Sequence, residues 1–116
     1  HSLGCITILR YLETLKENQK IGGAVLVAGF TSNLGYEEIG SFFKGPIAWE
    51  KINSHCKKFV VIHSDNDPYV SLNYGKIFKE KINAEVIVEH NMKHFSGDDG
   101  IMVLPIALES VLKISE

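Results

Sequence analysis

The chain alternates between apolar residues at helical spacing and short apolar runs that do not alternate with polar positions. Residues 3–17 have helical spacing and are apolar nearly all round at their start, which predicts a buried helix formed around Cys5, Ile6, Ile8, Leu9, Leu12 and Leu15. The runs AVLVAGF (24–30) and FVVIHS (59–64) are typical of strands covered on both faces of a parallel sheet. A third run, AEVIVEH (84–90), is shorter and ends in charged residues.

Two more helices complete the pattern. Ser71 is placed to cap a helix whose apolar side holds Tyr74, Ile77, Phe78 and Ile82. Pro105 suits the first turn of a closing helix, with Leu108, Val111 and Leu112 expected to face inward. The order helix, strand, loop, strand, helix, strand, helix predicts an α/β protein with a parallel sheet between two helical layers. The length of 116 residues suits a single domain, residues 1–116.

Composition removes several classes of protein from consideration. The formal net charge of −2 gives no electrostatic reason to expect binding to nucleic acid or to an anionic membrane. No apolar run approaches the roughly 18 residues of a membrane span, and nothing has the pattern of a secretory signal. We expect Cys5 in the core and Cys56, beside two lysines, at the surface as a free thiol. A cytoplasmic protein without a disulfide is therefore expected.

Candidate chemistry follows the ends of the predicted strands. FVVIHS runs into DNDPYV, which puts Asp65 and Asp67 just past a strand, and AEVIVEH leads to His94. Ser2, with glycine two places later and a helix following, matches the second half of a G-x-S-x-G nucleophile elbow. Serine needs a neutral imidazole to take its proton, and the imidazole needs a carboxylate to orient it. The chain order Ser, Asp, His therefore predicts a hydrolase triad.

Each of these residues also has a structural interpretation. Taken alone, Ser2 is better explained as a helix cap and Asp67 before Pro68 as a turn residue, and His94 is equally well explained as a surface histidine. His90 and His94, four apart and near Asp98 and Asp99, raise the question of a metal site. That spacing joins ligands only on a helix, and the surrounding asparagine and glycine favour a loop, so no metal is expected. His55 is expected at the surface and His63 in a strand wall.

Five segments of the sequence resemble a known family along nearly the whole chain. HSLG, GFT, GSFFKGPIAWEKI, SDNDPYV, and KHF followed by LPIALESVL are similar to the small serine hydrolases of the α/β-hydrolase superfamily that include the retinoblastoma-binding serine hydrolase and its bacterial relatives. The resemblance implies an α/β-hydrolase fold and the triad Ser2, Asp67 and His94, and it selects Asp67 over Asp65. Where the family commonly has glycine before the histidine, this chain has Lys93.

The same resemblance implies that strands preceding the elbow are missing from this sequence. We therefore expect the chain to be the C-terminal part of a longer hydrolase. The backbone N–H of Leu3, the residue after the serine, is the expected oxyanion donor, and the second donor would come from the missing part. FVVIHS (59–64) is expected beside one edge of the AVLVAGF strand (24–30). At the other edge we expect no strand of this chain.

The segment from Thr31 to Cys56 is too long for an ordinary connection between two strands. It is expected to form a helical cap, with Phe43 and Trp49 as candidate walls of a substrate pocket over Ser2.

The expected activity is hydrolysis of an ester, thioester or amide of a small molecule through an acyl-enzyme, without a cofactor. The alternative is a non-enzymatic interaction module on a hydrolase scaffold, although the sequence indicates no protein partner. Between the two acids, Pro68 should keep Asp67 extended and able to reach His94. Asp65 is expected to accept N–H groups within its own turn.

Overall fold

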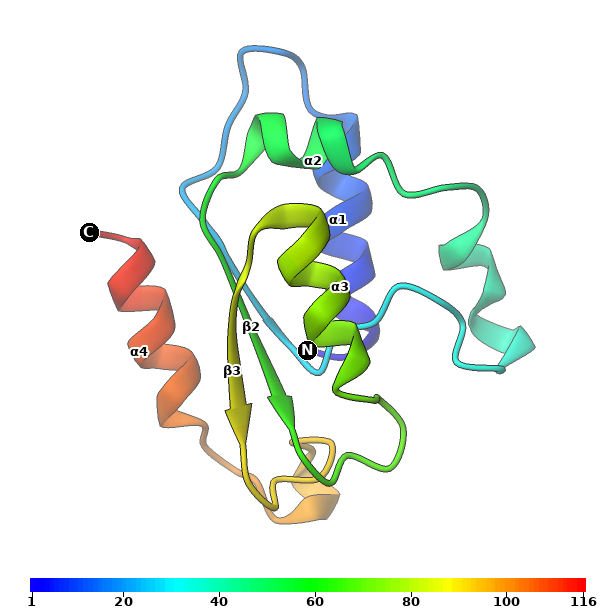
Figure 1. Cartoon of the computed structure of the whole chain (residues 1–116), viewed down its shortest axis with the longest axis vertical. Helices are drawn as coiled ribbons and strands as arrows, with labels where there is room; N and C mark the ends of the chain where they lie inside the picture. The colour runs from blue at the N-terminus through cyan, green and yellow to red at the C-terminus, as the bar shows by residue number, and fades with distance from the viewer.

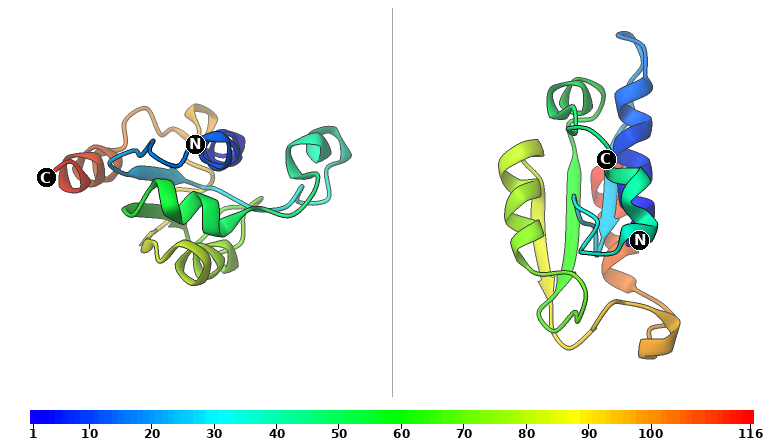
Figure 2. Two further views of the ribbon diagram at one scale, coloured as in Figure 1. Left: turned by 90° about the horizontal axis from the view of Figure 1, so that it is seen from above. Right: turned by 90° about the vertical axis from the view of Figure 1, so that its right-hand side faces the viewer.

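A three-stranded parallel sheet forms the centre of the computed structural model, which describes residues 1–116. The strands are β1 (Ala24–Val27), β2 (Phe59–Ser64) and β3 (Glu85–Glu89), in the order β1–β2–β3. Ala24 pairs with Phe59 at the start of β1, and Val60 pairs with Glu85 at the start of β3. All six residues of β2 are buried, as expected for a central strand covered on both faces. Helices cover both faces of this sheet (Figures 1 and 2), which confirms the α/β class.

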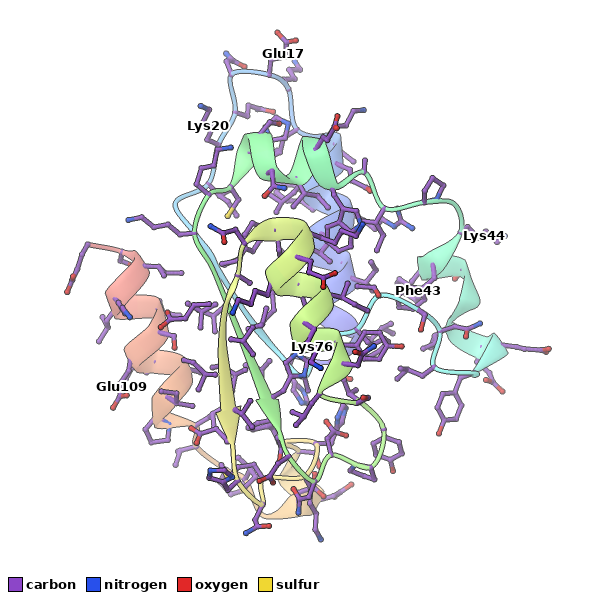
Figure 3. All side chains as sticks on the ribbon, viewed as in Figure 1. Glu17, Lys20, Phe43, Lys44, Lys76 and Glu109 are labelled. Carbon is purple, nitrogen blue, oxygen red and sulfur yellow. The ribbon has the colours of Figure 1, made fainter.

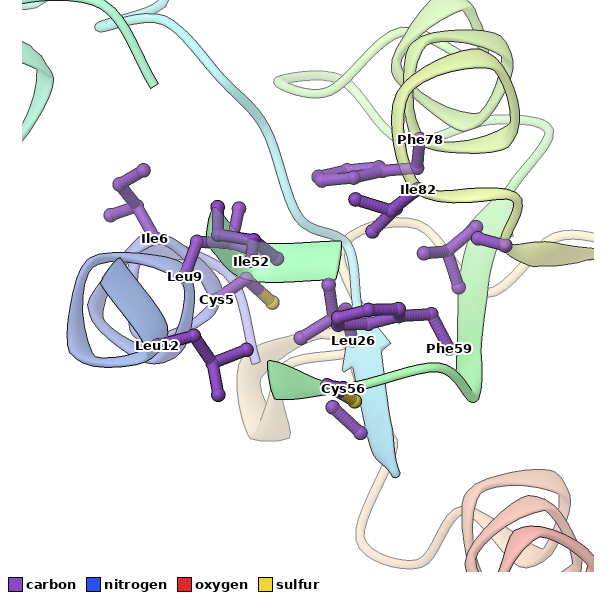
Figure 4. Close-up of a cluster of buried hydrophobic side chains, with 13 residues drawn as sticks. Cys5, Ile6, Leu9, Leu12, Leu26, Ile52, Cys56, Phe59, Phe78 and Ile82 are labelled. Atoms are coloured by element: carbon purple, nitrogen blue, oxygen red, sulfur yellow. The ribbon is translucent and has the colours of Figure 1, made fainter. Parts of the chain in front are cut away.

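One face of the sheet is covered by α1 (Leu3–Thr14), α2 (Trp49–His55) and α3 (Asn73–Ile82). Their inward side chains meet those of β1 and β2 in the main core cluster, shown in Figure 4. From α1 the fully buried residues are Cys5, Ile6, Leu9 and Leu12, a spacing that places them on one side of the helix. The predicted buried helix is thus present, but it ends at Thr14 rather than near residue 17.

The other face of the sheet is covered by α4 (Pro105–Ile114), which stands alone on that side in Figure 1. Pro105 occupies the first turn, as predicted. The predicted inward face was wrong, because Leu108, Val111 and Leu112 are 62%, 45% and 60% exposed. The contacts with the sheet are made instead by residues on the opposite stripe, namely Ile106, Ala107 and Ile114. This helix is apolar on both sides, so its spacing alone did not determine which side is buried.

Several polar or reactive side chains lie in the interior. Cys56 was expected at the surface but is 1% exposed, because it lies where α2 turns into β2 and packs into the main core cluster. The thiols of Cys5 and Cys56 are both free, and burial raises the pKa of each. His55, also expected at the surface, is buried, and its Nδ1 lies 2.6 Å from the carbonyl oxygen of Gln19. His63 lies in the strand β2, as expected, and is buried. Neither of its ring nitrogens has a hydrogen-bond partner.

Two long connections occupy the carboxyl ends of the strands. The segment after β1 contains the 3₁₀-helix η1 (Glu37–Phe43), and the segment after β3 contains η2 (Gly97–Asp99). The loop from β2 to α3 carries Asp67, and the loop after β3 carries His94. Because the strands are parallel, both loops leave the same edge of the sheet (Figure 1). No helix has the length and apolar character needed to cross a membrane.

Candidate active site

Ser2 lies on a sharp turn immediately before α1. Its backbone has φ 56° and ψ −123°, a conformation that non-glycine residues rarely adopt. The N–H of Ser2 donates to the carbonyl oxygen of Val27 at 2.8 Å, which ties this turn to the end of β1. The hydroxyl makes no capping hydrogen bond to α1. Its Oγ lies instead 2.8 Å from Nε2 of His94, so the interpretation of this hydroxyl as a helix cap does not hold.

The other ring nitrogen of His94 faces a carboxylate. Nδ1 of His94 lies 2.8 Å from Oδ2 of Asp67. The two side chains are 16% and 1% exposed, so this contact is well shielded from water. A carboxylate can only accept a hydrogen bond, which places the proton of a neutral imidazole on Nδ1 and leaves the lone pair of Nε2 facing the Ser2 hydroxyl. The geometry brings Ser2, His94 and Asp67 together in one hydrogen-bonded row.

Asp67 uses its two carboxylate oxygens for different purposes. While Oδ2 faces His94, Oδ1 accepts from the backbone N–H groups of Tyr69 at 2.8 Å and Val70 at 3.1 Å. The expectation that Asp65 would be the residue bound within its own turn was therefore wrong. A carboxylate accepts several hydrogen bonds at once, so Asp67 closes its turn and still reaches the imidazole. These bonds fix the orientation of the carboxylate.

Asp65 is occupied by a second histidine. Its side chain accepts from Nδ1 of His90 and from the backbone N–H of Asn91, the latter at 3.0 Å. The hydrogen bond from His90 holds the pKa of Asp65 below its ordinary value, and the same carboxylate raises the pKa of His90. His90 and His94 thus face different carboxylates, and the side chain of Asp99 accepts from the N–H of His94 and from the Ser96 hydroxyl. This arrangement does not converge as the ligands of a metal do.

The loop that carries His94 is tied to the Asp67 loop by Ser64 and Asn66. The buried Ser64 hydroxyl donates to Oδ1 of Asn66 at 2.8 Å and accepts from the N–H of Met92 at 3.0 Å. Oδ1 of Asn66 also accepts from the N–H of Lys93 at 2.9 Å. We call this group the Ser64–Asn66 latch. It holds the backbone immediately before His94 against the end of β2.

The backbone of the His94 loop is strained. Lys93 has φ 49°, in the left-handed region that glycine adopts at lower cost. Asn91 and Phe95 on either side also have positive φ. Residues in such conformations persist only where their surroundings hold them, and here the latch provides hydrogen bonds. The loop therefore keeps a tight shape with lysine in place of the glycine common in the family.

The N–H of Leu3 lies at the first position of α1, where the helix supplies no acceptor for it. The positive end of the dipole of α1, a helix of 12 residues, lies at the same place. An oxyanion formed beside Ser2 could accept from this N–H and would be favoured by the dipole. The geometry is therefore compatible with the oxyanion role expected for Leu3.

An open pocket of about 390 Å³ lies beside the Ser2 hydroxyl and the His94 ring. The remaining lining residues come from α1, from the segment after β1 and from the loop after β2, and they are Leu3, Phe30, Leu34, Tyr36, Ile39 and Tyr69. Tyr69 stands edge-on to His94, with ring centroids 5.3 Å apart. The pocket therefore opens directly onto the hydroxyl that His94 contacts.

The two residues expected to wall this pocket lie elsewhere. Phe43 is behind the wall, on the side of η1 turned toward α3 (Figure 3), and its ring centroid is 5.6 Å from that of the lining residue Phe30. Trp49 begins α2 and packs edge-on against Phe78 of the core, 6.3 Å between centroids. The aromatic content of the segment therefore predicted an apolar region correctly, but not which of its side chains reach Ser2.

Several residues of the site were missed from the sequence. Phe30 lies shortly after the end of β1 at Val27, so the rule that sites gather at strand carboxyl ends could have found it. Asn66 lies between the two aspartates of the same strand end, and the same rule applies to it. Leu34, Tyr36 and Ile39 lie in an irregular segment without periodicity, and no signal in the sequence distinguishes them from their neighbours.

The chain is similar to known proteins along most of its length. Residues 1–113 match the family described as serine hydrolase. The chain is 34% identical over 110 residues to the Bacillus subtilis (strain 168) protein named "Putative hydrolase YdeN", an alignment that covers 94% of this chain and 58% of that protein. The crystal structure of the ydeN gene product from B. subtilis is similar, with a TM-score of 0.91 and 33% identity over 98% of this chain and 62% of that one. The chain thus spans about three fifths of the length of these relatives.

Proposed function

Because this chain belongs to the serine hydrolase family, we propose that it cleaves an ester, thioester or amide of a small molecule through a Ser2–His94–Asp67 triad. The observation that carries the proposal is the row of two 2.8 Å contacts, Ser2 Oγ to His94 Nε2 and His94 Nδ1 to Asp67 Oδ2. This row leads from an exposed pocket to a carboxylate that is 1% exposed. A helix cap or a surface histidine would require neither contact.

The first half of the reaction forms an acyl-enzyme. Oγ of Ser2 attacks the carbonyl carbon while Nε2 of His94 takes the hydroxyl proton, and Asp67 stabilises the imidazolium through Nδ1. The carbonyl oxygen becomes an oxyanion that accepts from the N–H of Leu3. His94 then gives its proton to the leaving alcohol, thiol or amine as the carbonyl re-forms. The acyl group is now bound to Oγ of Ser2, and the imidazole is neutral again.

The second half repeats these steps with water. His94 removes a proton from a water molecule as the water oxygen attacks the acyl carbon, and the resulting oxyanion accepts from the same N–H. Collapse of this intermediate breaks the bond to Oγ of Ser2, which recovers its proton from His94. A carboxylic acid leaves, and the enzyme returns to its starting state. No metal or organic cofactor is required at any step.

A burst experiment tests this proposal. Rapid mixing with a p-nitrophenyl ester should release nitrophenol in a stoichiometric burst, because the good leaving group makes acylation of Ser2 faster than hydrolysis of the acyl-enzyme. Ser2→Ala should remove the burst and lower turnover by a factor on the order of 10⁶, as loss of the nucleophile does in serine proteases. Ser54→Ala is a matched control, since Ser54 is exposed on α2 and bonds only to the carbonyl of Lys51. A burst that survives Ser2→Ala would contradict the assignment.

A further inference from the structure

The pocket beside Ser2 has no charged wall. Apart from Ser2 and His94, all its lining residues are aliphatic or aromatic, and none is an aspartate, glutamate, lysine or arginine. The acidic pair Glu37 and Glu38 follows Tyr36 in the chain, but both side chains are exposed and neither lines the pocket. A charged group placed in this pocket would lose water without gaining a counterion, which is costly.

The floor of the pocket is formed by Phe30, which packs against other aromatic rings. Phe30 is 3% exposed, and its ring lies against Phe43 at 5.6 Å and edge-on to Tyr74 at 6.4 Å between centroids. The hydroxyl of Tyr74 is 2.6 Å from Oγ of Ser32, so this polar atom is already bonded. The floor is therefore apolar and offers a substrate no free hydrogen-bonding group.

The outer wall is held in place by Arg10 of α1. Its guanidinium donates to the carbonyl oxygens of Phe42, Lys44, Gly45 and Pro46, at 3.1–3.2 Å. Glu13, three residues along α1, binds the same guanidinium and accepts from the N–H of Ala48 at 2.6 Å. We call this group the Arg10–Glu13 clamp. It holds residues 42–48 against α1, including the end of η1, the helix that carries the lining residue Ile39.

From these features, and resting on the proposed function, we propose that the substrate is an uncharged ester with a short apolar acyl group that lies in this pocket. Apolar surface on the acyl group would be removed from water against Phe30, Leu34 and Ile39, which stabilises the complex. The volume of about 390 Å³ is near the lower end of the range for ligand pockets, so a short acyl chain fills the open pocket, whereas most of a long fatty acyl chain would extend beyond it into water. Ile39, on η1, is the proposed specificity-determining residue.

Four esters with the same leaving group test the proposal. The probes are p-nitrophenyl hexanoate, the p-nitrophenyl monoester of adipic acid, p-nitrophenyl ε-aminocaproate and p-nitrophenyl palmitate. The first three have similar chains that end in a methyl, a carboxylate and an ammonium group. We expect kcat/KM for the hexanoate to exceed that of either charged ester by about tenfold or more, since an uncompensated buried charge costs at least that much. The palmitate should also be a poorer substrate.

A variant of the wall sharpens the test. Ile39→Asp should lower kcat/KM for the hexanoate about tenfold, mainly through KM, and raise it for the ε-aminocaproate, because the new carboxylate can pair with the ammonium group. Leu108→Asp is the matched control, since Leu108 is exposed on α4 and does not line the pocket. It should leave the preference among the four esters unchanged.

The outcomes separate this inference from the function on which it rests. If the protein reacts with a fluorophosphonate at Ser2 but hydrolyses a charged ester or the palmitate as well as the hexanoate, the substrate class is wrong and the proposed function stands. Reaction at Ser2 without hydrolysis of any of the four esters also overturns the substrate class. If Ser2 does not react with a fluorophosphonate and none of the four esters is cleaved, the proposed function is wrong, and the proposed substrate class is wrong with it.

Discussion

Nδ1 of His94 lies 2.8 Å from Oδ2 of Asp67, whereas Asp65, two residues earlier on the same loop, binds His90. Both aspartates follow β2, so their positions at the strand end do not distinguish them. Burial does, because the side chain of Asp67 is 1% exposed and that of Asp65 is 36% exposed. A shielded carboxylate acts more strongly on an imidazole than one screened by water. This difference leads to the first prediction.

Asp67→Asn should lower turnover by roughly 10⁴, the effect of the same change in serine proteases, because an amide favours the wrong imidazole tautomer. The fold should persist, since the asparagine oxygen can still accept from Tyr69 and Val70. Asp65→Asn is the matched control and should leave turnover nearly unchanged. The measurement is kcat for both variants, with circular dichroism to check folding. If the two variants exchange ranks, Asp67 is not the acid.

A second prediction concerns the Ser64–Asn66 latch. Asn66→Ala removes the acceptor for the N–H of Lys93, so the strained loop should move and carry His94 away from Ser2. We expect kcat to fall between roughly tenfold and a hundredfold with KM little changed, because small misplacements of a reacting group cost about that much. Asn66 acts through His94 and is a positioning residue.

Asn53→Ala is the control for the latch. Asn53 donates to the carbonyl of Lys81 at 2.8 Å and joins α2 to α3, so it also loses a side-chain hydrogen bond to backbone. Its loss should reduce stability without changing kcat. Equal losses of kcat in the two variants would mean that the effect of Asn66 comes from general destabilisation and not from positioning.

A third prediction concerns the Arg10–Glu13 clamp. Arg10→Lys keeps the positive charge but cannot reach several carbonyl oxygens at once, because an ammonium lacks the planar fork of a guanidinium. The segment 31–48 should then exchange its amide hydrogens faster, and KM for p-nitrophenyl hexanoate should rise with kcat little changed. Lys16→Arg, at an exposed position near the end of α1, should change neither quantity. A loss of kcat with constant KM in Arg10→Lys would contradict a role for the clamp in shaping the pocket.

How much of this arrangement the sequence predicts depends on the kind of contact involved. The three strands, their order and the residues at their carboxyl ends follow from apolar runs and parallel topology, so Ser2, His94 and the pair of acids Asp65 and Asp67 could be named in advance. The choice of Asp67 over Asp65 came from the family resemblance, because both acids have the same spacing from β2. The structure gives that choice its physical basis in the bonds from Tyr69 and Val70.

Two kinds of feature could not be predicted from the sequence. One is a side chain that binds backbone carbonyl oxygens, and the other is the buried side of a helix that is apolar on all sides. Arg10 binds the carbonyl oxygens of four residues, and any residue supplies a carbonyl, so the clamp leaves no pattern in the sequence. Phe43 and Trp49 were misplaced because the aromatic content of the segment does not show which of its side chains face Ser2, and these two pack against Phe30 and Phe78 instead. On α4 either stripe was apolar enough to be buried, and the stripe with Leu108, Val111 and Leu112 is exposed. Figure 3 shows Glu109 of this helix pointing away from the sheet.

A fourth prediction concerns pH and stability. Burial lowers the pKa of His63 below 6.5, and its ring nitrogens have no hydrogen-bond partner. The unfolded chain therefore binds a proton at a higher pH than the folded chain does. As a result, the free energy of unfolding falls as the pH drops below about 6.5 and levels off below the folded pKa. His63→Leu should remove the part of this pH dependence that comes from His63.

Urea unfolding of both proteins at about pH 7.5 and about pH 5.5 measures the difference, since these values bracket the pKa of an unfolded histidine. The natural protein should lose more stability between the two pH values than His63→Leu does. His90→Gln is a useful comparison, because the pKa of His90 is raised and its pairing with Asp65 is lost on raising the pH, the opposite direction. Equal pH dependence in the natural protein and His63→Leu would show that His63 does not titrate in this way.

The central claim is that His94 activates Ser2, and site-resolved labelling with a fluorophosphonate tests it most directly. The purified protein is treated with the reagent, digested and mapped by mass spectrometry. One phosphonyl group should be found on Ser2 and on no other serine, because only Ser2 has its Oγ 2.8 Å from an imidazole nitrogen. Labelling should disappear in Ser2→Ala, become slow in Asp67→Asn, and persist in Ser54→Ala. An unlabelled protein, or a label that persists in Ser2→Ala, would contradict the account.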